Sequence, residues 1–122
     1  MGEPIPRKPK IHFLKTVEPF YSMVEFKAKT FEVRVNDRDF KTGDYLYLHL
    51  WEIGMNPWTD KHELVEVTYI LDSEDFCKKG MVIMAIKFIS KLEAEYHLGE
   101  DLYKEYLKIY ENHIDNYKQQ EN

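Results

Sequence analysis

The segment that most constrains this fold is YLYLHLW, residues 45–51, because it carries bulky side chains on both of its faces. Leucine alternates with tyrosine, histidine and tryptophan along it. Successive side chains of a β-strand point to opposite faces of a sheet. A strand with this sequence leaves a large apolar area in water unless both faces are covered. We therefore expect residues 45–51 to form a strand that is covered on both sides.

Four further segments have the composition of strands and are joined mostly by short turns. They are residues 11–14, 30–35, 63–71 and the nearly all-apolar 81–89. An apolar run of the last kind is typical of a central strand. Alternation predicts that Phe31, Val33 and Val35 of the second segment point inward. In the third segment it places Val65, Val67, Tyr69 and Leu71 together on one side.

A helix is expected over residues 18–26, between the first two strands. Pro19 suits a first helical turn, and Phe20, Met23 and Val24 recur at helical spacing. Turn and polar residues predict loops over residues 36–42, 53–61 and 72–80. The predicted fold class is α+β and mainly β: a small, mostly antiparallel β-barrel of five or six strands with a helix after the first strand.

An acidic and strongly helical extension follows the barrel segment, over residues 90–122. Its apolar positions form a stripe at helical spacing: Leu102, Tyr103, Tyr106, Leu107, Ile109, Tyr110, Ile114 and Tyr117. Gly99 interrupts the extension, and Asp101 is placed to cap the second helix. Because tyrosine buries its ring while its hydroxyl stays wet, the stripe suits two roles. It either packs on the barrel or binds a partner, including a second copy through residues 102–117.

Length and composition indicate one globular domain with one core, since the chain has 122 residues of which 43% are hydrophobic. Residues 1–10 contain three prolines and three basic residues and are expected to be a flexible arm; residues 11–89 form the domain. No apolar run approaches the roughly 18 residues of a membrane span, and the start lacks the apolar region of a secretory signal. Cys77 is the single cysteine, which fits a reducing cytoplasm.

Charge is unevenly spread along the chain, whose net charge is −5. Residues 1–44 hold nine Lys or Arg against seven Asp or Glu, a net charge of +2, whereas residues 90–122 hold four against eight, a net charge of −4. Proteins that grip long nucleic acids through phosphates are usually basic. We therefore expect at most a short or single anionic ligand, held by the N-terminal half.

Motifs for metal, cofactor or nucleophilic chemistry are not found in the sequence. The five histidines show no HxxxH spacing and Cys77 has no second cysteine, so no metal site or cofactor is expected. No P-loop or GxSxG pattern occurs. In the sequence HFLKT, His12 is most simply a strand-end residue, and Lys15 and Thr16 line a cleft only if the first strand lies beside the second.

The sequence KTFEVRVNDRDFKTGD, residues 29–44, is the best candidate for a binding or catalytic site. Glu32, Arg34 and Asn36 share the strand face opposite to the apolar one. One interpretation is a solvated face with a surface ion pair, which is worth roughly 0–1 kcal/mol. The other is a polar cleft wall, with Lys29 as a cation or nucleophile, Glu32 as an acceptor or proton carrier and Arg34 as an anion clamp.

Two further pairs of residues have both a ligand-binding and a structural interpretation. Asp37 and Arg38 either bind ligand or fix their loop through a local ion pair and turn hydrogen bonds. Trp51 and Trp58 either stack on bases, at roughly 1–3 kcal/mol per base, or close one end of the barrel.

The segments HFLKT, KTFEVRVNDRDFKTGDYLYL and VTYIL…MVIMAIKF resemble a small bacterial and phage family in the ASCH/PUA-like superfamily. ASCH domains are marked by a G-x-K-x-x-E-x-R pattern, and Lys29, Glu32 and Arg34 match its last three defined positions. Lys27 stands where the pattern has glycine, and glycine tolerates a positive φ much better than lysine. The run NDRDF looks like a signature of the smaller family. The resemblance covers residues 11–89.

This resemblance implies a pseudo-barrel with a helix beside its mouth and a cleft in which Lys29, Glu32 and Arg34 meet an RNA or a nucleotide-like small molecule. Some small ASCH proteins are enzymes, either amidohydrolases on acylated cytidine or ribonucleases, so Lys29 and Glu32 are also candidate catalytic residues. In the amidohydrolase branch a threonine occupies the position of Glu32. Three functions therefore remain open: RNA or nucleotide binding, hydrolysis of modified nucleosides or RNA, and protein interaction through the tyrosine-rich helix.

Overall fold

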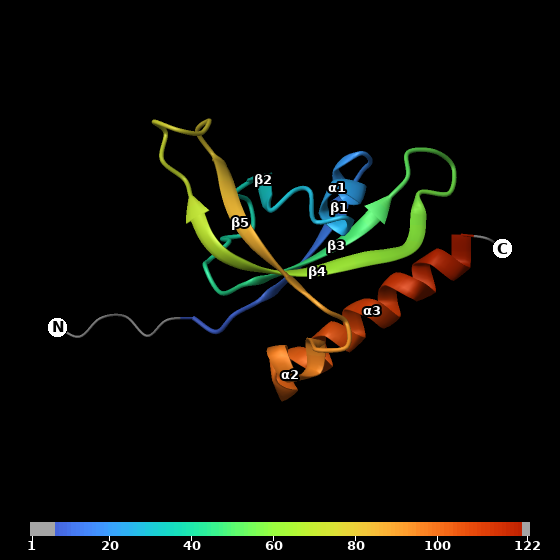
Figure 1. Ribbon diagram of the computed structural model, residues 1–122. Helices are drawn as coiled ribbons and strands as arrows, with labels where there is room; N and C mark the ends of the chain where they lie inside the picture. Colours follow the sequence, from blue (N-terminus) through green and yellow to red (C-terminus); the bar gives the residue numbers. More distant parts are fainter. Residues whose placement is uncertain (1–6, 121–122) are drawn as a thin grey trace.

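The computed structural model describes residues 7–120 and contains five strands and three helices (Figure 1). In chain order these are β1 (Ile11–Thr16), α1 (Phe20–Glu25), β2 (Phe31–Val35), β3 (Tyr45–Trp51), β4 (Trp58–Leu71), β5 (Met81–Ile89), α2 (Ala94–Leu98) and α3 (Glu100–Gln120). Five strands with a helix after the first confirm the predicted α+β class. No helix within residues 7–120 is long and apolar enough to cross a membrane.

One curled sheet holds all five strands in the order β1-β3-β4-β5-β2. β1 pairs with β3 in parallel, and the other three pairs are antiparallel. The sheet curves into a half-barrel, with α1 on its concave side and α3 running along its outer side (Figure 1). β1 and β2 are the two edges of the sheet, and β5 lies between two partners, as its apolar sequence predicts.

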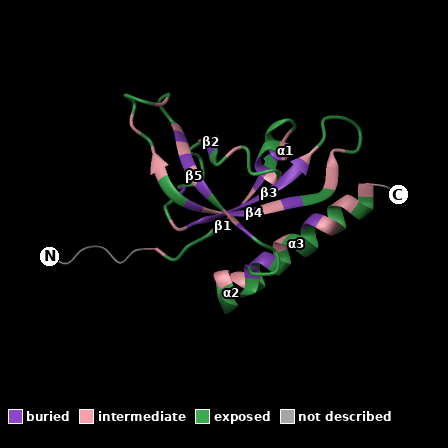
Figure 2. Ribbon diagram, viewed as in Figure 1, coloured by how far each residue is buried: buried purple, intermediate pink, exposed green. Residues whose placement is uncertain are grey.

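β3 is covered on both faces, which confirms the expectation from its sequence (Figure 2). Its leucines Leu46 and Leu48 join the core inside the half-barrel. Tyr45 and Tyr47 join a second core cluster on the outer face, which Tyr106 of α3 helps to cover. The covered outer face explains why a strand of seven residues has no solvated side.

In β2 the apolar side chains face solvent and Glu32 faces the interior, which is the opposite of the predicted orientation. Phe31, Val33 and Val35 were expected to point inward, but each is about half exposed, whereas Glu32 is only 2% exposed. The cause is the place of β2 at the sheet edge: α3 packs on β4 and β1, and no helix within residues 7–120 covers the outer face of β2. Alternation identifies the two faces of a strand, but the cover on each face decides which one is buried.

β4 differs from the prediction in length and in phase. It begins at Trp58, so the loop expected over residues 53–61 is shorter. A β-bulge leaves Thr68 unmatched between Val67 and Tyr69. An extra residue moves every later side chain to the other face. As a result Tyr69 is exposed, and Ile70 packs on the core in its place.

The N-terminal arm is anchored where the structure describes it. Residues 1–6 lie outside the described part of the chain. Arg7 and the main-chain N–H of Lys10 both bond to the carboxylate of Asp44, at 2.7 and 3.1 Å. These bonds attach residues 7–10 to the domain; the flexibility expected of residues 1–10 stays a prediction.

α3 packs on the half-barrel, but its buried face is rotated from the predicted stripe. Tyr106 and His113 are its buried residues, whereas Leu107 and Tyr110 are more than 40% exposed. Sequence analysis missed His113 because histidine is polar, although a hydrogen-bonded histidine is readily buried. Asp101 does not precede the helix as a cap, since α3 already begins at Glu100. Self-association through residues 102–117 stays a prediction.

α1 ends in a left-handed turn at Lys27, whose φ is 60°. The next two main-chain N–H groups, of Ala28 and Lys29, both donate to the carbonyl of Met23 at 2.9 Å. This closure directs the chain from the helix into β2. The buried face of α1 carries Tyr21 and Val24, whereas Met23 is 42% exposed.

Replacing Lys27 with glycine should stabilise the protein by roughly 0.5–1 kcal/mol, because glycine adopts a positive φ without the steric cost that a Cβ adds. Denaturant unfolding of the purified variant measures the change. Ala28→Gly is the matched control, since Ala28 is a neighbour without a positive φ, and it should be neutral or destabilising. A Lys27→Gly protein less stable than the wild type would contradict this account of the turn.

Candidate functional site

Arginine side chains connect the two edges of the curled sheet. Arg34 on β2 donates from Nη1 to the carbonyl of Lys15 and from Nη2 to Oγ1 of Thr16, both at 3.1 Å. Arg38, just after β2, donates to the carbonyl of Phe13 at 3.0 Å. β1 and β2 therefore lie side by side without a ladder of main-chain hydrogen bonds between them.

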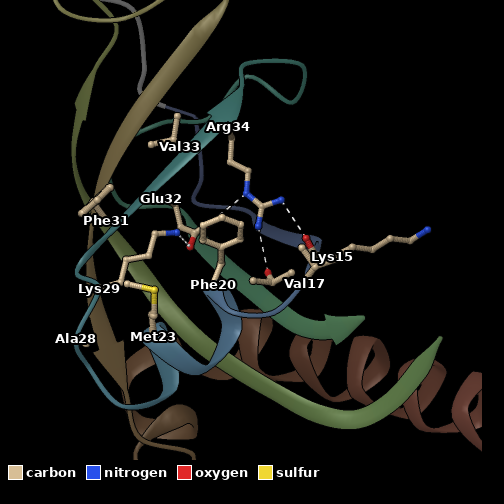
Figure 3. A pocket seen from close by; sticks show the side chains of 11 residues that line it. Lys15, Val17, Phe20, Met23, Ala28, Lys29, Phe31, Glu32, Val33 and Arg34 are labelled. Atoms are coloured by element: carbon tan, nitrogen blue, oxygen red, sulfur yellow. Dashed lines mark hydrogen bonds and ion pairs between the residues drawn. The ribbon is translucent and has the colours of Figure 1, made fainter. Parts of the chain in front are cut away.

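A cleft opens at the end of this gap, between β1, α1 and β2 (Figure 3). Its volume is about 450 Å³, within the roughly 300–1,000 Å³ of small-molecule sites. Its lining residues are Lys15, Thr16, Val17, Phe20, Met23, Ala28, Lys29, Phe31, Glu32, Val33 and Arg34. Most of them are apolar; of the charged residues, Glu32 and Arg34 lie on β2, Lys29 lies just before it and Lys15 lies on β1.

Glu32 is the centre of the polar part of the cleft. Its Oε1 accepts from Nζ of Lys29 at 2.9 Å, and its Oε2 accepts from Nε of Arg34 at 3.0 Å (Figure 3). A buried carboxylate needs such partners, because an unpaired charge in a protein interior is costly. The interpretation of this strand face as a solvated edge is therefore wrong. The three groups together carry one net positive charge.

Donors remain on both cations after these bonds. The Lys29 ammonium has three N–H groups and uses one on Glu32. Arg34 has five and uses three, on Glu32, Lys15 and Thr16. The lysine Nζ also lies 5.4 Å from the ring centroid of Phe20 and 5.6 Å from that of Phe31. The cleft thus places cationic donors beside aromatic surface.

Residues 11–86 match the model of a protein family described as a domain of unknown function, DUF3850. The chain belongs to this family. The match spans β1 to most of β5, and so includes every lining residue of the cleft, whereas α2 and α3 follow it. The chain matches none of the curated proteins with which it was compared.

Of the other predicted site residues in the DUF3850 domain, some line the cleft and others lie outside it. Thr16 lines it, but its hydroxyl is already bonded to Arg34. Lys15 lines it with its main chain only: the side chain extends away (Figure 3), and Nζ lies 3.9 Å above the ring of Trp51. Asp37 and Arg38 are exposed and outside the lining. Arg38 fixes its loop through the carbonyl of Phe13.

Trp51 and Trp58 also lie outside the lining of the cleft. They pair across β3 and β4 in a T-shaped contact, with ring centroids 5.2 Å apart. Trp58 also stacks on His49 at 5.3 Å. These contacts agree with the structural interpretation, in which the two tryptophans close one end of the barrel.

Sequence analysis missed two parts of the DUF3850 domain. Helical spacing was the only signal for Phe20 and Met23, yet both line the apolar part of the cleft. Asp44, which the sequence did not single out, is 1% exposed and binds Arg7 and His12. A local pattern cannot reveal either role, because both depend on segments that are distant in the sequence.

Buried histidines form a separate cluster beneath α3. His113 bonds to the hydroxyl of Tyr47 and to the carbonyl of Thr59, both at 2.7 Å. Both ring nitrogens of His49 and the Nδ1 of His62 lack a hydrogen-bond partner among residues 7–120. Among the same residues no group of three or more His, Cys, Asp or Glu side chains could hold a metal ion. The cluster helps to hold α3 on the sheet, through the Tyr47–His113 and His62–Tyr106 hydrogen bonds.

Proposed function

We propose that the cleft binds one unstacked base of a single-stranded RNA, or a free nucleotide. The observation that carries the proposal is Glu32, buried and clamped between Lys29 and Arg34 at the side of an apolar cleft. The clamp holds two cations in fixed positions with donors to spare. An anionic or acceptor-rich ligand with one flat apolar part suits such a site.

The apolar wall supports the base-binding part of the proposal. Phe20 is 50% exposed and Met23 42% exposed, so a ligand that covers them removes apolar surface from water. Proteins that recognise single-stranded RNA commonly stack unpaired bases on aromatic side chains and bond to their polar edges. Nζ of Lys29 lies 5.4 Å from the ring centroid of Phe20, and Arg34 lines the same cleft, so both cations are candidates to bond to a phosphate or a base acceptor beside a stacked ring.

Charge limits the proposed footprint to one or two nucleotides. The chain has a net charge of −5, and long phosphate backbones bind to proteins with many unpaired cations. In the cleft only Lys29 and Arg34 contribute cationic groups, since the ammonium of Lys15 points to Trp51. A compact ligand is therefore favoured over an extended one.

The resemblance to ASCH/PUA-like proteins gives the proposal independent support. The three residues that match the ASCH pattern, Lys29, Glu32 and Arg34, are the charged group of the cleft. Lys27 replaces the glycine of that pattern and still adopts the positive φ that glycine favours. We accordingly propose that the half-barrel is of the PUA/ASCH-like type.

Binding is favoured over hydrolysis by the state of Glu32. Both of its oxygens already accept hydrogen bonds from cations. A general base must be within hydrogen-bond reach of the proton it removes, whereas Glu32 is only 2% exposed and both of its oxygens face Lys29 and Arg34. Glu32 is better suited to orient Lys29 and Arg34 than to move a proton.

Replacing Phe20 with alanine should weaken binding of a mixed-sequence RNA pentamer by roughly 5- to 100-fold, the loss expected for one base–aromatic stack. Fluorescence anisotropy at low salt with a labelled pentamer measures the affinity. Phe26→Ala is the matched control: Phe26 ends the same helix and is 76% exposed, but it does not line the cleft. It should bind as the wild type does.

Two results would contradict the proposal. The first is a wild-type protein that binds neither the RNA pentamers nor ribonucleoside monophosphates at low salt, where phosphate contacts are strongest. The second is equal affinity of the Phe20→Ala and Phe26→Ala variants. Either would leave the cleft without a role in RNA or nucleotide binding.

A further inference from the structure

The main chain of β2 lines the cleft, and so do side chains of this strand. In an antiparallel pair, residues alternate between those that exchange hydrogen bonds with the partner strand and those that do not. The bonds at the two ends of β2 fix this alternation: Ile86 donates to the carbonyl of Thr30 at 3.0 Å, and Asn36 donates to that of Gly80 at 2.8 Å. Even-numbered residues of β2 therefore bond to β5.

The odd-numbered residues Phe31, Val33 and Val35 direct their N–H and C=O groups to the opposite edge, toward β1. The carbonyl of Val35 accepts from Asp37. Within residues 7–120, no hydrogen bond outside the β2–β5 ladder engages the main chain of Phe31 or Val33. These two residues line the cleft although their side chains point away from Arg34 (Figure 3).

We propose that this free main-chain edge reads the Watson–Crick edge of the bound base, with the N–H and C=O of Val33 as the donor and acceptor. The inference rests on the proposed function and adds how the base is recognised. Each of the four RNA bases has an acceptor next to a donor on that edge. A strand residue that faces a free edge offers the complementary donor and acceptor.

A base fits this edge better than an added peptide strand. Strand addition uses main-chain hydrogen bonds along several residues. Here Arg34 and Arg38 cross the gap to β1, so only Phe31 and Val33 remain open at the cleft. The cations beside them also favour a nucleotide over a neutral peptide. The short open edge therefore points to a compact ligand.

Val33→Pro tests the inference because it removes the N–H group of this residue and keeps its carbonyl. Proline is tolerated on an edge strand where the N–H faces away from the ladder, and Glu32 before it is already extended, as the residue before proline prefers. The matched control is Val35→Pro, which removes an N–H from the same free edge beyond the cleft lining. We expect Val33→Pro to bind the mixed RNA pentamer about tenfold more weakly, and Val35→Pro to bind as the wild type does.

Modified RNA gives a second test on the unchanged protein, which decides the matter if Val33→Pro does not fold. Pentamers of uridine, 5-methyluridine and 3-methyluridine differ by one methyl group, and the methyl at N3 alone blocks the Watson–Crick edge. We expect the wild type to bind the first two, and the 3-methyl pentamer at least about tenfold more weakly.

The outcomes separate the inference from the proposed function. Two results overturn the inference while the wild type still binds RNA. One is equal affinity of Val33→Pro and Val35→Pro for the mixed pentamer, and the other is equal affinity of the wild type for the 5-methyluridine and 3-methyluridine pentamers. In either case the cleft binds RNA without reading the base through this edge. A wild-type protein that binds the mixed pentamer but not the uridine pentamer also overturns the inference. The N–H and C=O of Val33 should pair with any of the four bases, including uracil. Failure to bind any RNA or nucleotide removes both.

Discussion

Replacing Asp44 with alanine should lower the free energy of unfolding by about 3–5 kcal/mol, the usual cost of removing one partner from a buried ion pair. Asp44 is 1% exposed. Its carboxylate accepts two hydrogen bonds from Arg7, at 2.7 and 2.8 Å, and one from His12 at 2.8 Å. The main-chain N–H groups of Lys10 and Lys41 donate to it as well. Alanine leaves all of these donors without their acceptor.

The carboxylate joins three segments of the chain. Arg7 and Lys10 precede β1, His12 lies in β1, and Lys41 lies in the loop that leads to β3. Burial alone would raise the pKa of Asp44, but the bonds from Arg7, His12 and the two main-chain groups outweigh it and lower the pKa to about 2. A lowered pKa means that folding favours the charged form, so this stability is complete above about pH 4 and is lost below it.

Urea unfolding at pH 7 measures the effect, with Asp37→Ala as the control. Asp37 is exposed, and its nearest cation, Arg38, is 3.9 Å away, so its removal should cost about 0–1 kcal/mol. If Asp44→Ala is as stable as Asp37→Ala, the bonds to Arg7 and His12 do not hold the N-terminal segment on the domain.

The strands and their order of appearance could be predicted from sequence because each depends on local pattern. Residues 45–51 form a strand covered on both faces, since both faces are bulky, and residues 81–89 form a central strand, since they are apolar throughout. The orientation of β2 could not be predicted in this way. Its apolar face is exposed because α3 packs elsewhere, and its charged face is buried because Arg34 reaches across to β1.

Individual residues of the cleft were predictable to different degrees. Lys29, Glu32 and Arg34 stood out through alternation and family resemblance together. Phe20 was not predicted as a cleft residue, because helical spacing alone does not distinguish a side chain that packs in the core from one that lines a cleft. The free main-chain edge at Val33 left no signal in the sequence, since it follows from the pairing of β2 with β5.

Acidification from pH 8 to pH 5 should destabilise the protein by about 4 kcal/mol, because two histidines are buried in the neutral form. His49 is fully buried between the rings of Phe13 and Trp58, with centroids at 4.2 and 5.3 Å. His62 is 2% exposed, stacks on Tyr47 and bonds to the hydroxyl of Tyr106. Neither site holds a carboxylate within hydrogen-bond distance of the ring.

Burial and nearby positive charges set the direction of this effect. Burial, and then the charges of His113 and Lys15, lowers the pKa of His49 to about 3. Burial, and then Lys91, lowers the pKa of His62 to about 3. Unfolded histidine has a pKa near 6.5, so between pH 6.5 and pH 3 the unfolded chain binds more protons and stability falls as the pH falls. At pH 5 this amounts to about 2 kcal/mol for each histidine.

A His49→Phe variant isolates one half of the effect. Phenylalanine fits a site between two aromatic rings and cannot take up a proton, so the loss of stability between pH 8 and pH 5 should fall to about 2 kcal/mol. His97→Gln is the control, because His97 is only partly buried and lies 3.6 Å from the carboxylate of Glu66; it should keep the full loss. An unchanged pH dependence in His49→Phe would mean that His49 does not stay neutral in the fold.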